Sequence, residues 1–544
     1  MQLFLAFVVA LSTTAALIPL LSRWAPALGL TDRPGPRKVH SVPVPRVGGL
    51  AMCVGLLVPA LVTLPMSPAM RGVIVGIGVL LVFGLWDDRV DLDYRVKLVG
   101  QVIAAALCMK VGGVRIGDLS IDGVNVLPPH VQAVITFVFL VGITNAVNLT
   151  DGLDGLAGGL VLLCLCAVAL FAITSGHPGV EALCLIEAGA ILGFLRFNTH
   201  PARIFMGDSG SQVLGFSVGA LAVLATQGDD NDLSPALPLL LLGLPILDTV
   251  TVMTTRMLAG RSPFSPDRNH LHHRLLALGF SHRESVAIIY VLQVSLVLLA
   301  YFLRFESDLE VMLVFGAFAV TTLGLLYAAT RAGWRVQRVN PQGVTSTRLD
   351  LLPHAARLPA IALGVMIACL VAYAATVLSE SRRVTIDLGI LSAGMLAVLL
   401  LPSLWRNSRA LQMFERGVAY VSVVLLVYLD QTSPDKPPLL ATASWALIGI
   451  TGTAALLRFW CSPTRRFEVT TLDLIVVFIA LVLPNLPGSV ALPADLPQGI
   501  AKAVILLYVV EMLLNFDFKL LMPRVFLGAT LAVIAGRAFL GVGI

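Results

Sequence analysis

Four short polar segments interrupt an otherwise apolar sequence, and each carries side chains suited to phosphate chemistry. They are residues 86–93, 145–159, 197–211 and 261–274. Carboxylates mark the first three, whereas histidines and arginines mark the fourth. Carboxylate oxygens are preferred ligands of Mg²⁺, which also binds substrate phosphates, and cationic side chains bind phosphate oxygens. These residue types suit phosphoryl transfer, which depends on positioning, charge neutralisation and a metal ion.

The first two segments are rich in carboxylates and amides. Asp87 and Asp88 are adjacent at the predicted end of a membrane helix, where charges are costly unless paired or metal-bound. A solvated helix end explains that pair equally well. The second segment has the spacing N-x-x-N-x-x-D-x-x-D together with four glycines. Its amides and carboxylates can bind uracil or ribose hydroxyls, and glycine allows close approach of the backbone, so binding is favoured over a simple turn.

The third and fourth segments add a helix start and a histidine cluster. Asp208 begins a predicted span between small residues, where a helix N-terminus attracts anions and their metals. Phe205 could stack on a base, although a core phenylalanine and an N-cap aspartate are the alternatives. Three of the nine histidines, His270, His272 and His273, lie within four residues. Zinc is one candidate ligand, but flanking arginines would repel a cation, so phosphate binding is favoured.

The elements that position these segments are membrane helices. The chain has 544 residues, 57% hydrophobic and 13% charged, with a mean hydropathy of +0.90, whereas soluble domains carry about 25% charged residues. We expect an all-α polytopic membrane protein with an eleven-span core, residues 1–335, and about seven further spans in residues 336–544. The predicted spans are 3–22, 46–65, 70–86, 95–112, 131–148, 155–175, 179–196, 209–227, 234–255, 284–303, 309–331, 359–378, 384–404, 415–430, 439–458, 469–486, 499–515 and 525–542.

Loop charge predicts the orientation. If the N-terminus lies outside, the inside loops of the first eleven spans contain 20 lysines and arginines, and the outside loops contain 4. We therefore expect a multi-pass protein of the inner (plasma) membrane, with all four polar segments on the cytoplasmic side. Lys38, in a basic inside loop, either serves this orientation alone or receives a lipid phosphate at the membrane surface.

The order of the motifs resembles the polyprenyl-phosphate N-acetylhexosamine-1-phosphate transferases, of the glycosyltransferase family 4 type. The resemblance covers about residues 1–335 and rests on Asp87-Asp88, Asn-Leu-Thr-Asp-Gly-Leu-Asp-Gly-Leu at 148–156, Phe-Met-Gly-Asp-Ser-Gly-Ser at 205–211, and His-Leu-His-His at 270–273. An uninterrupted triple histidine is typical of the branch that acts on the muramyl-pentapeptide nucleotide. The interrupted run is similar to the branch that uses UDP-N-acetylglucosamine and starts envelope polysaccharides.

The resemblance implies a Mg²⁺-dependent phosphotransferase, with Mn²⁺ as an alternative ion. An undecaprenyl or similar phosphate would attack a UDP-N-acetylhexosamine, giving UMP and a polyprenyl-diphospho-sugar. Asp208 would bind the metal, and Asp87 and Asp88 would bind or activate the lipid phosphate and could join the metal ligands. The residues implied in substrate binding are Lys38, Asn148, Asp151, Gly152, Leu153, Asp154, Asn198, Phe205, His270, His272 and His273.

Several alternatives stay open at this point. The chain could be a phospho-muramyl-pentapeptide transferase, a lipid-linked sugar transporter or flippase, or an inactive scaffold. Direct attack by the lipid phosphate is favoured over a covalent intermediate, because the second pKa of a phosphate monoester is near 6 and the dianion is abundant at pH 7. We expect membrane lipids but no nucleic acid as partners. The sequence leaves open whether the protein forms a homodimer, and it does not explain residues 336–544.

Overall fold

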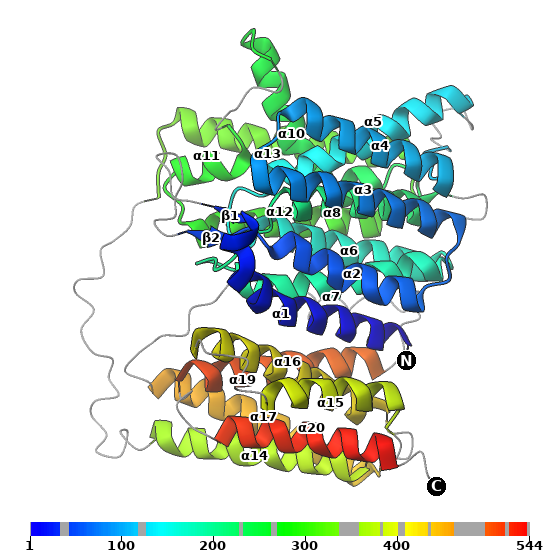
Figure 1. Cartoon of the computed structure of the whole chain (residues 1–544). Coiled ribbons are helices and arrows are strands. Elements are labelled where there is room, and N and C mark those ends of the chain that lie inside the picture. Colours follow the sequence, from blue (N-terminus) through cyan, green and yellow to red (C-terminus); the bar gives the residue numbers. More distant parts are fainter. Residues whose placement is uncertain are drawn as a thin grey trace. The chain divides into compact units, whose positions relative to one another are not determined.

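The computed structural model describes residues 2–32, 43–117, 127–227, 232–262, 269–336, 358–380, 384–400, 408–432, 437–461, 495–516 and 522–540. Nearly all of these residues lie in α-helices, and their β-structure consists of one short pair, β1 (Thr31–Asp32) with β2 (Val44–Pro45). The chain divides into two compact units, one formed by Met1–Arg338 and the other by most of the following residues (Figure 1).

The described helices follow the predicted spans within a few residues in most cases. The first unit contains α1 (Gln2–Leu28), α2 (Gly48–Thr63), α3 (Pro68–Val90), α4 (Tyr94–Gly112), α5 (Pro129–Thr150), α6 (Leu156–Thr174), α7 (Pro178–Asn198), α8 (Asp208–Thr226), α9 (Pro238–Leu241), α10 (Gly243–Leu258), α11 (Leu271–Ala277), α12 (His282–Phe302) and α13 (Asp308–Arg331). The second contains α14 (Leu358–Glu380), α15 (Ile386–Leu400), α16 (Ser408–Thr432), α17 (Pro438–Cys461), α19 (Asp495–Phe516) and α20 (Met522–Leu540). The predicted span 469–486 lies outside the described residues.

Length and composition make this a membrane protein. Within the described ranges, nine helices are long and apolar enough to cross a membrane. Local sequence sets several helix starts: Ser281 with Glu284, and Ser307 with Glu310, form capping boxes that satisfy the first backbone N–H groups of α12 and α13. The prediction of an all-α polytopic membrane protein is confirmed.

The prediction of one continuous span at 234–255 is wrong, because the structure breaks it into α9 and α10 at Leu242. Pro245 has no N–H, so it cannot bond to the carbonyl oxygen of Leu241 four residues earlier. That oxygen instead accepts hydrogen bonds from Cys164 Sγ at 2.9 Å and from Gln293 Nε2 at 2.8 Å. Helices α6 and α12 therefore satisfy the backbone group that the proline releases.

Helix α8 is the most enclosed element of the first unit. Nearly all of its residues are buried, and it packs against α2, α3, α5 and α6 (Figure 1). Its first turn meets α3 so closely that a Cβ atom at Gly84 would lie 2.3 Å from the Cα atom of Ser209. Glycine is therefore required at this crossing, which fixes the N-terminus of α8 and with it Asp208.

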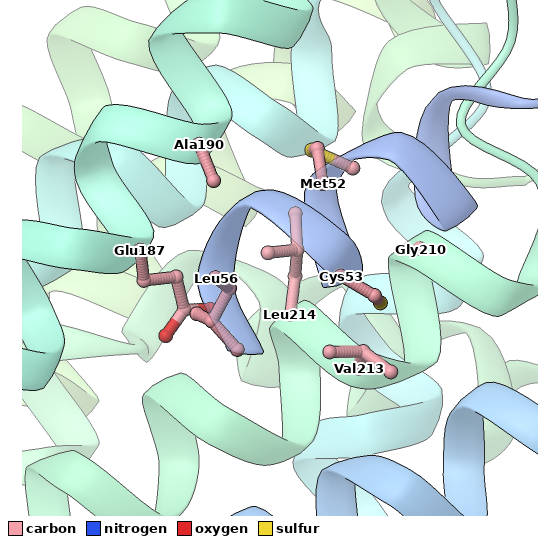
Figure 2. A pocket seen from close by; sticks show the side chains of 8 residues that line it. All are labelled: Met52, Cys53, Leu56, Glu187, Ala190, Gly210, Val213 and Leu214. Carbon is pink, nitrogen blue, oxygen red and sulfur yellow. The ribbon is translucent and has the colours of Figure 1, made fainter. Parts of the chain in front are cut away.

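A buried carboxyl group lies halfway along the packed helices α7 and α8. Glu187 is fully buried, the hydroxyl of Ser217 donates a hydrogen bond to its Oε1, and its Oε2 has no partner among the described residues. Beside it is a cavity of about 10 Å³, which Met52 and Cys53 of α2 also line (Figure 2). That volume is close to what one water molecule needs.

Removing the Ser217 hydroxyl is expected to destabilise the protein. In Ser217→Ala the buried Glu187 loses its hydrogen-bond donor, which costs about 1–3 kcal/mol for an unsatisfied buried polar group. We expect a lower melting temperature in detergent. Because removing both partners is nearly neutral, the double variant Glu187→Leu/Ser217→Ala should recover most of the loss. Equal melting of Ser217→Ala and the parent would contradict this account.

The second unit has a buried ion pair of its own. Lys502 Nζ in α19 lies 2.6 Å from Asp430 Oδ2 in α16 and 3.3 Å from the Ser444 hydroxyl in α17. The ammonium also lies 5.1 Å from the ring centroid of Trp445. Because charges within a membrane are costly unless they are paired, these contacts hold three helices of the second unit in a fixed register.

Candidate active site

Two carboxylates from different helices converge on one lysine. Asp87 lies in the last turn of α3, Asp208 is the first residue of α8, and Lys97 lies in the first turn of α4. The Nζ atom of Lys97 is 2.7 Å from Asp87 Oδ2 and 2.7 Å from Asp208 Oδ2. The Lys97 and Asp208 side chains are 29% and 26% exposed. A ligand can therefore reach the cationic point between the two carboxylates.

Asp88 has a different environment from Asp87. Its Oδ1 accepts a hydrogen bond from the backbone N–H of Asp208 at 2.8 Å, and its Oδ2 accepts bonds from Ser209 N–H at 3.1 Å and from the Ser209 hydroxyl at 2.6 Å. Gly207 has a φ of +73°, and a Cβ atom there would lie 2.5 Å from Asp88. Asp88 thus satisfies the first donors of α8 and holds Asp208 in place. The structure separates two residues to which the sequence assigned one task.

Amide side chains link α4, α5 and α8 near the start of α8. Asn148 Nδ2 donates to the Ser211 hydroxyl at 2.8 Å. Deeper in the bundle, Gln101 Nε2 donates to Gln212 Oε1 at 3.1 Å, and Asn145 Nδ2 donates to Gln101 Oε1 at 2.6 Å. These bonds bring the 145–159 segment against the start of α8, as the expectation of a shared site requires.

Asp151 directly follows α5, and the pKa of its carboxyl group is strongly raised. Burial, and then the negative charges of Asp208, Asp154 and Asp88, raise the pKa of its carboxyl group from 3.8 to about 7. The carboxylates are therefore close enough to repel one another. Without a bound cation, Asp151 is largely protonated below pH 7.

This raised pKa predicts a pH-dependent stability. The folded protein binds a proton at Asp151 that the unfolded chain releases above pH 3.8, so this residue costs stability increasingly as the pH rises toward 7. The variant Asp151→Asn cannot ionise. We expect its melting temperature, measured without divalent cations, to exceed that of the parent by a margin that grows up to pH 7 and is constant above it. A margin that does not change with pH would contradict the assignment.

The Asp154 carboxylate contacts the loop between α7 and α8. Its Oδ2 atom accepts a hydrogen bond from the backbone N–H of Ala202 at 3.0 Å and lies 2.7 Å from His200 Nδ1. The side chain of Asp154 is 19% exposed and that of His200 is 37% exposed. One carboxylate oxygen of Asp154 is therefore already bound by the protein's own loop.

Asn198 is buried and both ends of its amide bind backbone. Its Oδ1 accepts from Gly155 N–H at 2.9 Å, and its Nδ2 donates to the carbonyl oxygen of Ile204 at 2.9 Å. The Asn198 amide therefore holds the loop, and its expected place near the nucleoside stays a prediction. Phe205, in the same loop, is partly exposed, and its backbone N–H donates to the carbonyl oxygen of Pro45 at 2.8 Å.

The histidine segment is anchored by a carboxylate that the sequence analysis did not single out. His270 Nδ1 lies 2.9 Å from Asp248 Oδ2 in α10, and the backbone N–H of Leu271 donates to Asp248 Oδ1 at 2.7 Å. Asp248 thus accepts from the first N–H of α11 and orients His270. A single aspartate within a predicted apolar span was the sequence signal for this role.

His272 brings the histidine segment onto the turn after α5. It is buried, and a Cβ atom at Gly152 would lie 2.4 Å from His272 Nε2, so glycine is needed for this contact. Burial, and then the neighbouring His273, lower the pKa of His272 to about 4. His272 is therefore neutral at pH 7.

Some sequence predictions fall outside the described residues, and some site residues were missed. Lys38 and residues 263–268 are not among those that the structure describes.

The sequence prediction used Lys97 only as one of the loop charges that predict the membrane orientation. A lysine at the start of an apolar helix, ten residues after Asp87, was nevertheless a usable signal for the site. His200 and His282 were also missed; they are isolated in sequence, and only folding brings them to Asp154.

The carboxylates fit a divalent metal. One oxygen of Asp87 and one of Asp208 already converge on a cation, the ammonium of Lys97. Magnesium prefers such oxygen ligands, completed by substrate phosphates and water. After burial, the negative charges of Asp208, Asp154 and Asp88 also raise the pKa of Asp151, so several carboxylates lie near this point. Asp208 and Asp87 are the carboxylates that could hold such an ion.

Comparisons with known proteins identify the family of the chain. The family model described as Glycosyl transferase family 4 matches residues 70–226. A Bacillus subtilis protein named probable undecaprenyl-phosphate N-acetylglucosaminyl 1-phosphate transferase is 37% identical over 299 residues, covering 54% of this chain and 82% of the relative. A Mycolicibacterium smegmatis decaprenyl-phosphate N-acetylglucosaminephosphotransferase is 38% identical over 294 residues, covering 48% and 72%.

A Yersinia pestis undecaprenyl-phosphate alpha-N-acetylglucosaminyl 1-phosphate transferase is 30% identical over 318 residues, which cover 57% of this chain and 87% of the relative. These matched lengths account for about half of the chain, and the family model matches residues 70–226, which lie within the first compact unit. The chain belongs to the glycosyl transferase family 4, in the branch of the polyprenyl-phosphate N-acetylglucosamine-1-phosphate transferases.

Proposed function

We propose that the protein transfers N-acetylglucosamine 1-phosphate from UDP-N-acetylglucosamine to a polyprenyl phosphate and releases UMP. An oxygen of the lipid phosphate bonds to the β-phosphorus of the donor, and the bond from that phosphorus to the bridging oxygen of UMP breaks. The product is a polyprenyl-diphospho-sugar, the first intermediate of an envelope polysaccharide.

The convergence of Asp87, Asp208 and Lys97 at the ends of three helices carries this proposal. At a helix end, a lipid phosphate anchored in the membrane and a nucleotide from water can reach the same point. Bound Mg²⁺ would neutralise the charge of the donor diphosphate, and the Lys97 ammonium would neutralise that of the incoming phosphate. A transporter would instead gather its polar residues near the membrane midplane.

The three aspartates have separate tasks in this proposal. Asp208 and Asp87 hold the metal, and Asp87 accepts any proton that remains on the lipid phosphate. Asp88 positions Asp208 through the start of α8. The lipid dianion is abundant at pH 7, so we favour its direct attack. Trapping a phosphosugar on the enzyme in a single turnover without lipid would contradict this mechanism.

We assign substrate-binding roles to the remaining residues from their sequence motifs and their positions in the structure. The donor end of the site consists of Asn148, Asp151, Gly152, Leu153 and Asp154 with Phe205 stacked on uracil. His270, His272 and His273 would contact the diphosphate or sugar; His272, being neutral, can accept or donate one hydrogen bond through each ring nitrogen. Lys38 would meet the lipid phosphate. Asn198 is a positioning residue, because its amide is engaged with backbone groups.

The proposed orientation places this chemistry in the cytoplasm. Positively charged loops favour the cytoplasmic side, and the 20-to-4 imbalance puts the N-terminus outside. Helix α3 then ends and helix α8 then begins at the cytoplasmic face, where nucleotide sugars are made. A cysteine introduced at exposed Asp91 should react with a membrane-impermeant thiol reagent only after the membrane is opened.

The test of the function is UMP release by membranes that contain the protein, supplied with UDP-N-acetylglucosamine, polyprenyl phosphate and Mg²⁺. We expect release that requires both the lipid and the metal. The UDP-linked muramyl-pentapeptide and UDP-N-acetylgalactosamine serve as competing donors. Release of UMP only from the muramyl-pentapeptide nucleotide would move the protein to the other branch, and no release from any of these donors would overturn the proposal.

A further inference from the structure

Asp154, His200 and His282 form a cluster of possible metal ligands beside the candidate active site. They come from the turn after α5, the loop before α8 and the first residue of α12. Their ligand atoms all lie within 4.8 Å of one another, and all three residues are partly buried. The residues are 46 and 82 positions apart in the sequence, so only the fold brings them together.

The cluster is already ordered by contacts among its members. His200 Nδ1 lies 2.7 Å from Asp154 Oδ2, and His282 Nε2 lies 3.4 Å from the backbone oxygen of Asp154. The two imidazole rings stack with their centroids 4.1 Å apart and an angle of 23° between their planes.

Surrounding hydrogen bonds hold each ligand-bearing segment. The hydroxyl of buried Tyr290, two turns along α12 from His282, donates to the backbone oxygen of Gly155 at 2.7 Å. Ala202 N–H binds the Asp154 carboxylate at 3.0 Å. These bonds tie α12 and the α7–α8 loop to the same turn. Such support around the ligands is what keeps metal-binding side chains in place.

We propose that Asp154, His200 and His282 bind a transition-metal ion of the zinc class, separate from the Mg²⁺ of the transfer reaction. Two imidazole nitrogens and one carboxylate are ligands that Zn²⁺, Co²⁺ and Ni²⁺ accept, whereas Mg²⁺ prefers oxygen ligands alone. Three protein ligands leave a fourth position open for water or another ligand. Zinc binding between His200 and Asp154 displaces the proton that they share, and this proton is released to water.

A zinc ion at this position would also affect the transfer reaction; this expected effect rests on the proposed function. Asp154 shares its turn with Asp151 and Gly152, which are assigned to the donor nucleotide. A metal bound to Asp154 withdraws its carboxylate from the nucleotide. Zinc is therefore expected to inhibit the transfer, and donor nucleotide is expected to relieve that inhibition.

The test measures metal binding to the purified full-length protein, prepared without a histidine tag and stripped with a chelator. Co²⁺ and Zn²⁺ are titrated in the presence of excess Mg²⁺, with visible absorption of Co²⁺ and elemental analysis after dialysis as readouts. We expect one Zn²⁺ per chain. His200→Gln and His282→Gln should each weaken binding at least 100-fold, since even the loss of a supporting residue costs about 10–100-fold.

Matched controls separate this cluster from other histidines. His273→Gln alters the histidine segment, and His130→Gln alters an exposed histidine of α5; both should keep the parent affinity. Gel-filtration profiles and melting temperatures check that each variant is folded. Unchanged binding in folded His200→Gln and His282→Gln, or loss of binding in His273→Gln instead, would overturn the proposal. Because no substrate is present, failure of this test is distinct from failure of the proposed transferase function.

Discussion

Asp208→Asn is expected to reduce UMP release by at least about 10³-fold while the protein still inserts in the membrane. The carboxylate is the point at which the start of α8, the Lys97 ammonium and the proposed metal meet. Removing one preorganised charge or donor at a phosphoryl-transfer centre costs about 10²–10⁵-fold in rate. Membranes containing equal amounts of variant and parent protein provide the comparison.

The matched control for this variant is Asp91→Asn. Asp91 lies at the end of α3, four residues after Asp87, but its side chain is 88% exposed. We expect activity within about twofold of the parent, because exposed ion pairs contribute little. If Asp208→Asn keeps near-normal turnover in the same assay, Asp208 does not hold the metal and the assignment of the centre is wrong.

Lys97→Met is expected to have the second-largest effect, a loss of about 10²–10³-fold in kcat/KM for the lipid substrate. The ammonium is the charge that both Asp87 and Asp208 contact at 2.7 Å. Without it, the carboxylates repel each other and the incoming phosphate loses a cationic partner. Lys97→Arg keeps the charge but not the compact ammonium, so it should restore part of the activity.

Lys110→Met tests whether position on α4 matters. Lys110 lies in the last turn of the same helix and is exposed, so its removal should leave activity unchanged. A comparable loss of activity in both lysine variants would point to a general requirement for α4 rather than to the contacts of Lys97. Full activity of Lys97→Met would remove Lys97 from the site.

The sequence predicted the helices well because each span must be apolar and long enough to cross a membrane. It missed the break between α9 and α10, because the apolar run continues through Pro245 and the compensating donors, Cys164 and Gln293, belong to other helices. A proline break in a membrane span is tolerated when neighbouring side chains satisfy the released carbonyl. No local pattern shows that they can.

The site residues were predictable where motif spacing carried the information, and not where packing did. Asp87 and Asp88 are adjacent in sequence, yet Asp88 accepts hydrogen bonds from the first backbone N–H groups of α8, whereas Asp87 meets Lys97 beside Asp208. That difference depends on how α3 and α8 cross, which is a property of the folded bundle. Lys97 escaped notice for a similar reason, since its two carboxylate partners come from two other helices.

The most direct test of the central claim follows the β-phosphorus of the donor. Purified protein receives UDP-N-acetylglucosamine with radioactive phosphorus at the β position, together with polyprenyl phosphate and Mg²⁺. We predict that the label moves into the organic-solvent-extractable lipid, in equal amount to the UMP released, and that Asp208→Asn abolishes this transfer. Label that stays in UDP while the sugar alone reaches the lipid would contradict sugar-1-phosphate transfer.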